Sequence, residues 1–243
     1  MPHSSSRPAL VVAVDGPSGS GKSTTAREVA RRLGYRYVDT GSMYRAITWW
    51  LLDRGIDVTD RDVVARAVGV EAGGPVLLVT TDPDAPGVAV DGFDVTAHIR
   101  DANVTAAVSA VSAVPEVRAR LVTIQRSIAA DGGVVLEGRD IGTTVTPDAP
   151  VKVFLTADAS VRAARRSAEL PRNDHAGPAI SVEDTRADLA RRDHLDSSRA
   201  VSPLSQALDA VVIDSTGLSV DQVAERILVL VDAHRRAVEA ESP

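Results

Sequence analysis

The stretch GPSGSGKST, from Gly16 to Thr24, constrains the fold more than any other part of the chain. It follows the apolar run ALVVAVD and precedes STTAREVARRL (Ser23–Leu33), whose helical spacing ends at Gly34. The pattern G-x-x-x-x-G-K-S between a strand and a helix is typical of a phosphate-binding loop. Its glycines let backbone N–H groups face phosphate oxygens, and the positive end of the following helix dipole adds to the attraction. The stretch therefore predicts a phosphate site at the end of a buried strand.

The loop holds one of only two lysines among the 27 basic residues of the chain, the other being Lys152. Lys22 offers a compact charge to the β- and γ-phosphates, where the planar fork of an arginine fits less well. The hydroxyl of Ser23 is a candidate ligand for Mg²⁺, and Glu137, after the apolar run VVL, is a second one, although such a glutamate taken alone is more often solvated. We expect ATP with Mg²⁺ on Gly16, Pro17, Ser18, Gly19, Ser20, Gly21, Lys22, Ser23 and Thr24.

Short apolar runs alternate with helical patterns along the rest of the chain. The expected strands are Val11–Val14, Tyr35–Val38, Val134–Leu136, Val151–Leu155 and Ala210–Ile213. The expected helices are Ser23–Leu33, Ser42–Arg54, Pro115–Ala130 and Ser160–Glu169, and capping-box sequences at Ser181–Asp184 and Ser219–Gln222 open two more. This alternation predicts an α/β protein of the P-loop three-layer class, with a central parallel sheet and helices on both faces. Gly73–Gly92, with two strand-like runs around DPDAPG, interrupts the alternation and predicts a hairpin insertion.

Composition excludes several classes of protein. The net charge of −6 argues against a general nucleic-acid binder, and the absence of cysteine excludes disulfides and cysteine-based metal sites. No apolar run approaches the ~20 residues needed to cross a bilayer. The segment MPHSSSRPAL lacks the apolar part of a signal peptide, so we expect a loose tail over 1–8 and a cytoplasmic location. No long apolar surface demands a partner, and we expect a monomer that binds neither nucleic acid nor membrane.

Arginine and aspartate cluster after three of the expected strands, in DTGSMYR (39–45), EGRDIGT (137–143) and RRDHLDSSR (191–199). Each cluster also has an ordinary interpretation, such as a surface ion pair between Arg192 and Asp196 at i,i+4 spacing. The carboxyl ends of parallel strands, however, meet at one edge of a sheet, where ligands bind. Arginines that face a phosphate-binding loop favour a second substrate that also carries a phosphate.

Seven motifs together resemble bacterial cytidylate (CMP) kinases, which are nucleoside-monophosphate kinases of the P-loop class. They are DGPSGSGKST, DTGSMYR, DVTAHIR, EGRDIGT, PDAPVKVFL, RRDHLDSSRAVSPL and DSTGLSVDQV, and the resemblance runs from about Ala9 to Val231. It implies one kinase domain over 1–243, with a core of 9–38, 106–161 and 200–235 and a tail over 236–243. By the same resemblance, 39–105 would be a monophosphate-binding region that contains the hairpin, and 162–199 a lid with its adjoining helix. Glu137 stands where some members of the family have aspartate, which leaves its direct contact with Mg²⁺ open.

The resemblance also implies roles for individual residues. Arg45, Arg139 and Arg199 would hold the monophosphate of CMP near Thr40, and Asp196 with Arg192 would hold the sugar hydroxyls. Ser109, Arg118 and Asp140 would contact the cytosine edge, although Ser109 alone, in TAAVSAVSAV, would more often be a packed helix residue. Lys22, Arg139 and Arg192 would be catalytic. Arg165 and its neighbour Arg166 would reach the phosphates of ATP, with a solvated helix face as the alternative.

The implied reaction is phosphorylation of CMP and dCMP by ATP, with UMP a poor substrate. A carboxylate such as Asp140 accepts a hydrogen bond from the N4 amino group of cytosine, whereas uracil presents an acceptor there. Two alternatives stay open. The chain could be a P-loop kinase for another small acceptor, such as UMP or a sugar, or a nucleotide-binding regulator without catalytic activity.

Overall fold

The structure of the protein is a computed structural model, and it describes residues 9–69, 73–169, 182–199 and 201–241. The expected tail over 1–8, the start of the capping box at Ser181 and the stretch PRNDHAGP (171–178) of the expected lid lie outside these residues.

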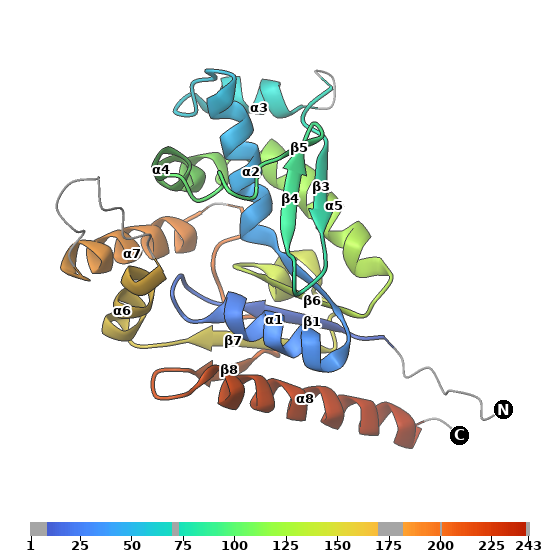
Figure 1. The fold of residues 1–243 in the computed structure, drawn as a ribbon. Helices are drawn as coiled ribbons and strands as arrows, with labels where there is room; N and C mark the ends of the chain where they lie inside the picture. Colours follow the sequence, from blue (N-terminus) through green and yellow to red (C-terminus); the bar gives the residue numbers. More distant parts are fainter. Residues whose placement is uncertain (1–8, 70–72, 170–181, 200, 242–243) are drawn as a thin grey trace.

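The five expected strands form one parallel sheet in the order β2-β6-β1-β7-β8 (Figure 1). Their bounds are Val11–Asp15 for β1, Arg36–Asp39 for β2, Val134–Gly138 for β6, Val151–Thr156 for β7 and Val211–Asp214 for β8. In β1, Val12 and Val14 face one side of the sheet while Ala13 faces the other, and all three are fully buried. Apolar residues on both faces of a strand require cover on both sides, which is why the sheet is parallel with helical crossovers.

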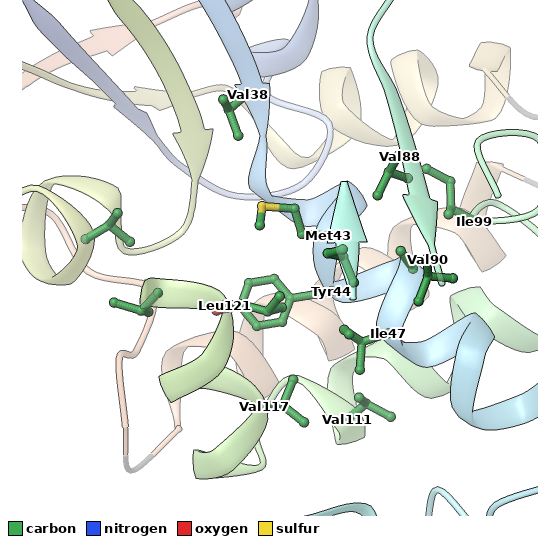
Figure 2. Close-up of a cluster of buried hydrophobic side chains, with 14 of the residues drawn as sticks. Val38, Met43, Tyr44, Ile47, Val88, Val90, Ile99, Val111, Val117 and Leu121 are labelled. Atoms are coloured by element: carbon green, nitrogen blue, oxygen red, sulfur yellow. The ribbon is translucent and has the colours of Figure 1, made fainter. Parts of the chain in front are cut away.

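Helices cover the two faces with separate cores. α1 (Lys22–Leu33) and α8 (Val220–Glu241) pack beside each other against one face. α2 (Thr40–Asp53) and α5 (Pro115–Ala130) pack against the other face, where Val38 of β2 meets Met43 and Leu121 (Figure 2). The three-layer architecture expected from the sequence is therefore confirmed. α8 runs to Glu241, whereas the sequence interpretation ends the core at residue 235.

The hairpin insertion is also confirmed, as an antiparallel sheet beside α2 (Figure 1). Its strands are β3 (Leu77–Thr80), β4 (Gly87–Val90) and a short β5 (Phe93–Asp94). The helix α3 (Arg61–Val68) was not expected from the sequence, and α4 (Ala102–Val111) was expected only as a helix around Ser109, without bounds. The insertion also contacts α1, where Arg27 Nε donates a 3.0 Å hydrogen bond to the carbonyl of Pro83.

α6 (Ala159–Glu169) and α7 (Val182–Ser197) pack against each other at the end of the sheet where β1 enters the glycine loop. Arg162 joins them, because its Nη1 atom lies 2.5 Å from the carboxylate of Asp193 and also donates to the carbonyl of Ser18 at 3.0 Å. The arginine-rich segment thus contacts the glycine loop directly.

Candidate active site

The glycine loop turns sharply between β1 and α1. Gly16, Gly19 and Gly21 all have positive φ angles, of 146°, 76° and 88°. A Cβ atom on Gly16 would lie 2.0 Å from the carbonyl oxygen of Leu155 on β7, so the close approach of the two strands also requires glycine here. The loop therefore has the backbone conformation expected of a phosphate-binding loop.

Lys22 is the first residue of α1, and its side chain lies back over the loop. Its Nζ atom donates a 2.8 Å hydrogen bond to the carbonyl of Pro17, and the side chain is buried. Burial lowers the pKa of Lys22, and the nearby guanidinium of Arg139 lowers it further. A buried ammonium without a full counter-charge favours the arrival of an anion, which would restore its ordinary pKa.

The ends of β1, β2 and β6 open into one cavity, which we call the central pocket. It is lined by Ser18, Gly19, Gly21, Lys22, Ser23, Thr24, Asp39, Thr40, Gly41, Tyr44, Arg45, Ile99, Arg100, Val108, Ser109, Ser112, Arg118, Glu137, Gly138, Arg139, Asp140, Arg166, Arg192, Asp196 and Arg199. The predicted meeting of the glycine loop with the three arginine and aspartate clusters is thus observed. Ser109, on α4, also lines this pocket.

Glu137 is the next-to-last residue of β6, and it is buried rather than solvated. Tyr37 donates a 2.6 Å hydrogen bond from Oη to Oε1 of Glu137, and Thr40 donates to the backbone carbonyl of Glu137 at 2.7 Å. The Ser23 hydroxyl lies near its carboxylate, and Asp39 lies opposite it in the register of β2 and β6. Burial raises the pKa of Glu137, and Asp39 raises it further.

Tyr37 and Asp39 were not singled out as site residues from the sequence. Asp39 stands within the quoted motif DTGSMYR and ends a strand, which was a usable signal. No sequence pattern indicated that Tyr37 belongs to the site, because its contact with Glu137 depends on the register of β2 and β6. Burial, followed by the charge of Glu137, raises the pKa of the Tyr37 hydroxyl, which therefore stays a proton donor.

A cluster of guanidinium groups faces the glycine loop across the pocket. Arg45 donates through Nη1 to the carbonyl of Ile99 at 3.0 Å and to Oγ1 of Thr105 at 2.9 Å. Arg192 donates to the backbone carbonyl of Thr105 at 3.0 Å, so it does not form the surface pair with Asp196 that its spacing allowed. Burial, followed by the charges of Arg192 and Arg166, lowers the pKa of Arg45 to about 10. Neighbouring cations that depress one another's pKa values form a site for an anion.

Asp196 joins two of the predicted arginines. It accepts a 2.9 Å hydrogen bond from Nε of Arg139, and its other oxygen forms an ion pair with Arg199. Arg139 also donates from Nη2 to the hydroxyl of Ser18, at 2.8 Å. A single guanidinium therefore connects the glycine loop to the segment that carries Asp196 and Arg199.

Arg118 and Asp140 form a second ion pair deep in the pocket. Nη2 of Arg118 lies 2.5 Å from Oδ2 of Asp140, and the guanidinium lies over the ring of Tyr44, 5.3 Å from its centroid. Asp140 begins the π-helical turn Ile141–Val145, which Asp15 holds in place. The two carboxylate oxygens of Asp15 accept from the backbone N–H groups of Ile141 and Gly142, each at 2.8 Å.

Arg165 is not among the residues that line the central pocket. Its guanidinium donates to the side chain and carbonyl of Ser215, at 2.9 and 2.8 Å, and to the carbonyl of Ser20 at 3.4 Å. It contacts the glycine loop at Ser20 without lining the central pocket, whereas Arg166 lines that pocket.

No group of three or more histidine or acidic side chains within the described residues is arranged to hold a metal ion. Within the same residues, no helix is both long enough and apolar enough to span a bilayer. Ser23, Glu137 and Asp39 nevertheless place hydroxyl and carboxylate oxygens beside the phosphate loop. Oxygen donors of this kind suit Mg²⁺, which binds through one or two carboxylates together with phosphate oxygens and water.

Comparison with known proteins identifies close relatives. The model of the cytidylate kinase family matches residues 12–233. A cytidylate kinase from Streptomyces avermitilis is 53% identical over 232 residues, which cover 95% of this chain and 96% of that protein. One from Streptomyces coelicolor is 54% identical over 230 residues, which cover 94% and 95%. Among solved structures, a gluconokinase from Sinorhizobium meliloti 1021 has a TM-score of 0.49 and 16% identity, over 98% of this chain and 99% of that one. That likeness is too distant to bear on activity.

Proposed function

The chain belongs to the cytidylate kinase family, and from this premise we propose that it transfers the γ-phosphoryl group of ATP to the phosphate of CMP and dCMP, and only poorly to that of UMP. The observation that carries the proposal is the position of Arg139 between Ser18 and Asp196. It joins a donor-phosphate loop to a cationic site for a second anion within one pocket. A kinase whose acceptor is itself a phosphate needs both a loop for the donor phosphates and a cationic site for the acceptor phosphate.

The donor half is the loop from Gly16 to Thr24, with Lys22 on the β- and γ-phosphates. The residues that would hold Mg²⁺ are Ser23 directly and Glu137 directly or through water, with Asp39 close by. When bound with ATP, this ion neutralises charge that develops on the transferring phosphoryl group. Arg165 would contribute to this half by holding the carbonyl of Ser20, and Arg166, which lines the pocket, would face the phosphates.

The acceptor half has three parts. Arg45, Arg139 and Arg199 bind the monophosphate with Thr40 nearby, and Asp196 with Arg192 binds the sugar hydroxyls. Ser109, Arg118 and Asp140 bind the base, where the carboxylate of Asp140 accepts from the N4 amino group of cytosine. Uracil would place a carbonyl oxygen against that carboxylate, and a buried acceptor without a donor is costly.

The proposed transfer uses no general base. A nucleoside monophosphate has a second ionisation near pH 6, so its attacking oxygen is already largely anionic at pH 7. What this chain supplies is in-line positioning of the two phosphates by Lys22, Arg139 and Arg192, together with charge neutralisation. Segment 39–105 would serve as the monophosphate-binding region and 162–199 as the lid that excludes water from the transfer.

ADP release in a coupled assay with MgATP tests whether this pocket is catalytic, with and without CMP. We expect CMP to stimulate ADP release by wild-type protein, and Lys22→Met to lose at least ~100-fold of that activity, because the buried cation at the phosphates is removed. No stimulation by CMP would favour the regulator or a different acceptor. We also expect a monomer in the cytoplasm that binds neither nucleic acid nor membrane, and sedimentation velocity tests the first of these.

A further inference from the structure

Tyr37 is a buried polar residue next to the proposed magnesium site that the mechanism does not use. It lies two residues before Asp39 on β2, and side chains at alternate positions of a strand face the same side of the sheet. Since Asp39 lies opposite Glu137 in the register, Tyr37 faces the same side as the carboxylate. The 2.6 Å hydrogen bond from its Oη atom ends on Oε1 of Glu137, and the two residues are only 2% and 3% exposed.

Tyr37 itself is fixed in place. Its backbone N–H donates to the carbonyl of Thr81 at 2.8 Å, and its ring packs in the core under α1 with Val135 of β6. Tyr37 does not line the central pocket but a smaller cavity beside Ser23 and Asp39, and its hydroxyl is joined to the central pocket by its hydrogen bond to Glu137. Any functional role of this hydroxyl is therefore a role in placing the carboxylate.

The terminal torsion of a glutamate is broad, so an unrestrained carboxylate rotates easily. A hydrogen bond to one oxygen removes that freedom and directs the other oxygen. Ser23 and Lys22 lie on the pocket side of Glu137, and Asp39 repels its charge. We propose that Tyr37 is a positioning residue, which holds Oε1 of Glu137 so that the second carboxylate oxygen faces the magnesium ion of MgATP.

The inference rests on the proposed function, since it assumes that ATP arrives with Mg²⁺ at Ser23 and Glu137. Without the hydroxyl, the carboxylate is free to turn toward the ammonium group of Lys22. Its alignment with the ion is then lost, while the backbone N–H groups of the glycine loop are unchanged. Removal of the hydroxyl should weaken the part of ATP binding that depends on Mg²⁺ and spare the part that does not.

The test measures ATP affinity by calorimetry in Mg²⁺ and again in EDTA, for wild-type protein and Tyr37→Phe. The readout is the ratio of the two affinities, which is the enhancement by magnesium. We expect Tyr37→Phe to reduce this enhancement about tenfold, the lower end of what loss of an outer contact to a metal ligand costs. Affinity in EDTA should stay within about twofold of wild type, because the hydrogen bond of the Tyr37 hydroxyl goes to Glu137 and not to the glycine loop.

Tyr35→Phe is the matched control. Tyr35 lies just before the same strand, and its hydroxyl accepts from the backbone N–H of Leu10 at 3.1 Å and from Arg235 at 2.9 Å, away from the pocket. The change removes the same atom from a hydrogen-bonded site, so it reproduces any general loss of stability. We expect it to leave the enhancement by magnesium at the wild-type value.

A double-mutant cycle with Glu137→Gln shows whether Tyr37 acts through Glu137. We expect the Tyr37→Phe change to have no further effect on the enhancement once Glu137 is replaced. An unchanged enhancement in Tyr37→Phe, an equal loss of affinity in EDTA, or full additivity with Glu137→Gln would each overturn the inference. None of these results bears on the proposed function, which is tested separately by the release of ADP from wild-type protein with CMP and with other nucleotides.

Discussion

Arg118 and Asp140 form an ion pair with 2.5 Å between Nη2 and Oδ2, in side chains that are only 3% and 6% exposed. A pair this deeply buried is costly to place there, and breaking it leaves an uncompensated charge. In the proposed site, the carboxylate of Asp140 also has a partner in the substrate. We therefore expect its orientation by Arg118 to decide which base fits.

Asp140→Asn should narrow the preference for CMP over UMP. An amide can turn its NH₂ group toward the O4 of uracil, whereas a carboxylate only accepts. We expect the ratio of kcat/KM for CMP to that for UMP to fall at least ~10-fold, since such contacts discriminate by about 1–3 kcal/mol. The folded fraction cancels in this ratio, so loss of stability from the broken ion pair does not disturb the result. An unchanged ratio would remove Asp140 from base recognition.

Arg192 and Arg191 are neighbours on α7 that should behave differently. Arg192 lines the central pocket and donates to the carbonyl of Thr105, and burial lowers its pKa, as does Arg166. Arg191 is 66% exposed and pairs with Asp188 on the same helix surface. We expect Arg192→Ala to reduce kcat/KM for CMP about 100-fold, or about 3 kcal/mol, and Arg191→Ala to stay within about twofold. A change in kcat/KM of the same size in both variants would contradict a catalytic role for Arg192.

Asp15 should make the stability depend on pH. Burial raises its pKa to about 6, although the backbone N–H groups of Gly142 and Ile141 lower it. The folded protein therefore holds the proton more tightly than the unfolded chain, in which an aspartate titrates near 4. The contribution of Asp15 to the free energy of unfolding is greatest below about pH 4, falls by about 3 kcal/mol up to about pH 6, and is level above that.

A carboxyl-carbon NMR titration checks this directly, with a midpoint near pH 6 expected for Asp15. The stability difference between wild-type protein and Asp15→Asn should change by the same 3 kcal/mol between about pH 4 and pH 7. A midpoint near 4 would show that the hydrogen bonds from the π-helical turn outweigh burial.

Gly16 and Gly55 offer a paired test of the loop geometry. Both have positive φ, but a Cβ on Gly16 would meet the Leu155 carbonyl at 2.0 Å, whereas one on Gly55 has nothing within 4 Å. Gly55→Ala should cost about 1–2 kcal/mol of unfolding free energy, from backbone strain alone. Gly16→Ala adds a backbone clash between two strands, and we expect a loss of more than about 4 kcal/mol by urea denaturation.

The strands and most helices were predictable from the sequence, because apolar runs and helical spacing are local signals. The confirmed capping box shows this best, since Ser219 Oγ accepts from the N–H of Gln222 and the Gln222 side chain accepts from the N–H of Ser219. Ser109 was expected in a helix, but the bounds of α4 were not predicted, because half of ANVTAAVSAV is valine, serine or threonine, which are weaker helix formers than alanine. α3 was missed although Asp60 caps it, because the helix is short.

The sequence predicted which residues belong to the site better than it predicted which of their side chains pair with one another. The carboxyl-end rule brings the glycine loop, 39–45 and 137–143 to one pocket, and the structure places them there, together with residues of 191–199 from α7 and its C-terminal end. Which side chains pair depends on distances in the folded structure, and the spacing of residues along the sequence does not give these distances. Arg139 meets Asp196 across 57 positions of sequence, and Tyr37 meets Glu137 across 100. Local spacing instead suggested a pair of Arg192 with Asp196.

The most direct test of the central claim is the substrate panel. Initial rates of ADP release are measured with MgATP and CMP, dCMP, UMP, AMP or GMP, each over a range of concentration. We expect CMP and dCMP to give the highest kcat/KM, with UMP at least ~10-fold lower and the purine nucleotides lower still, because cytosine offers an amino donor to Asp140 at the position where uracil offers an acceptor. Equal kcat/KM for CMP and UMP, or a preference for a purine nucleotide, would contradict this assignment.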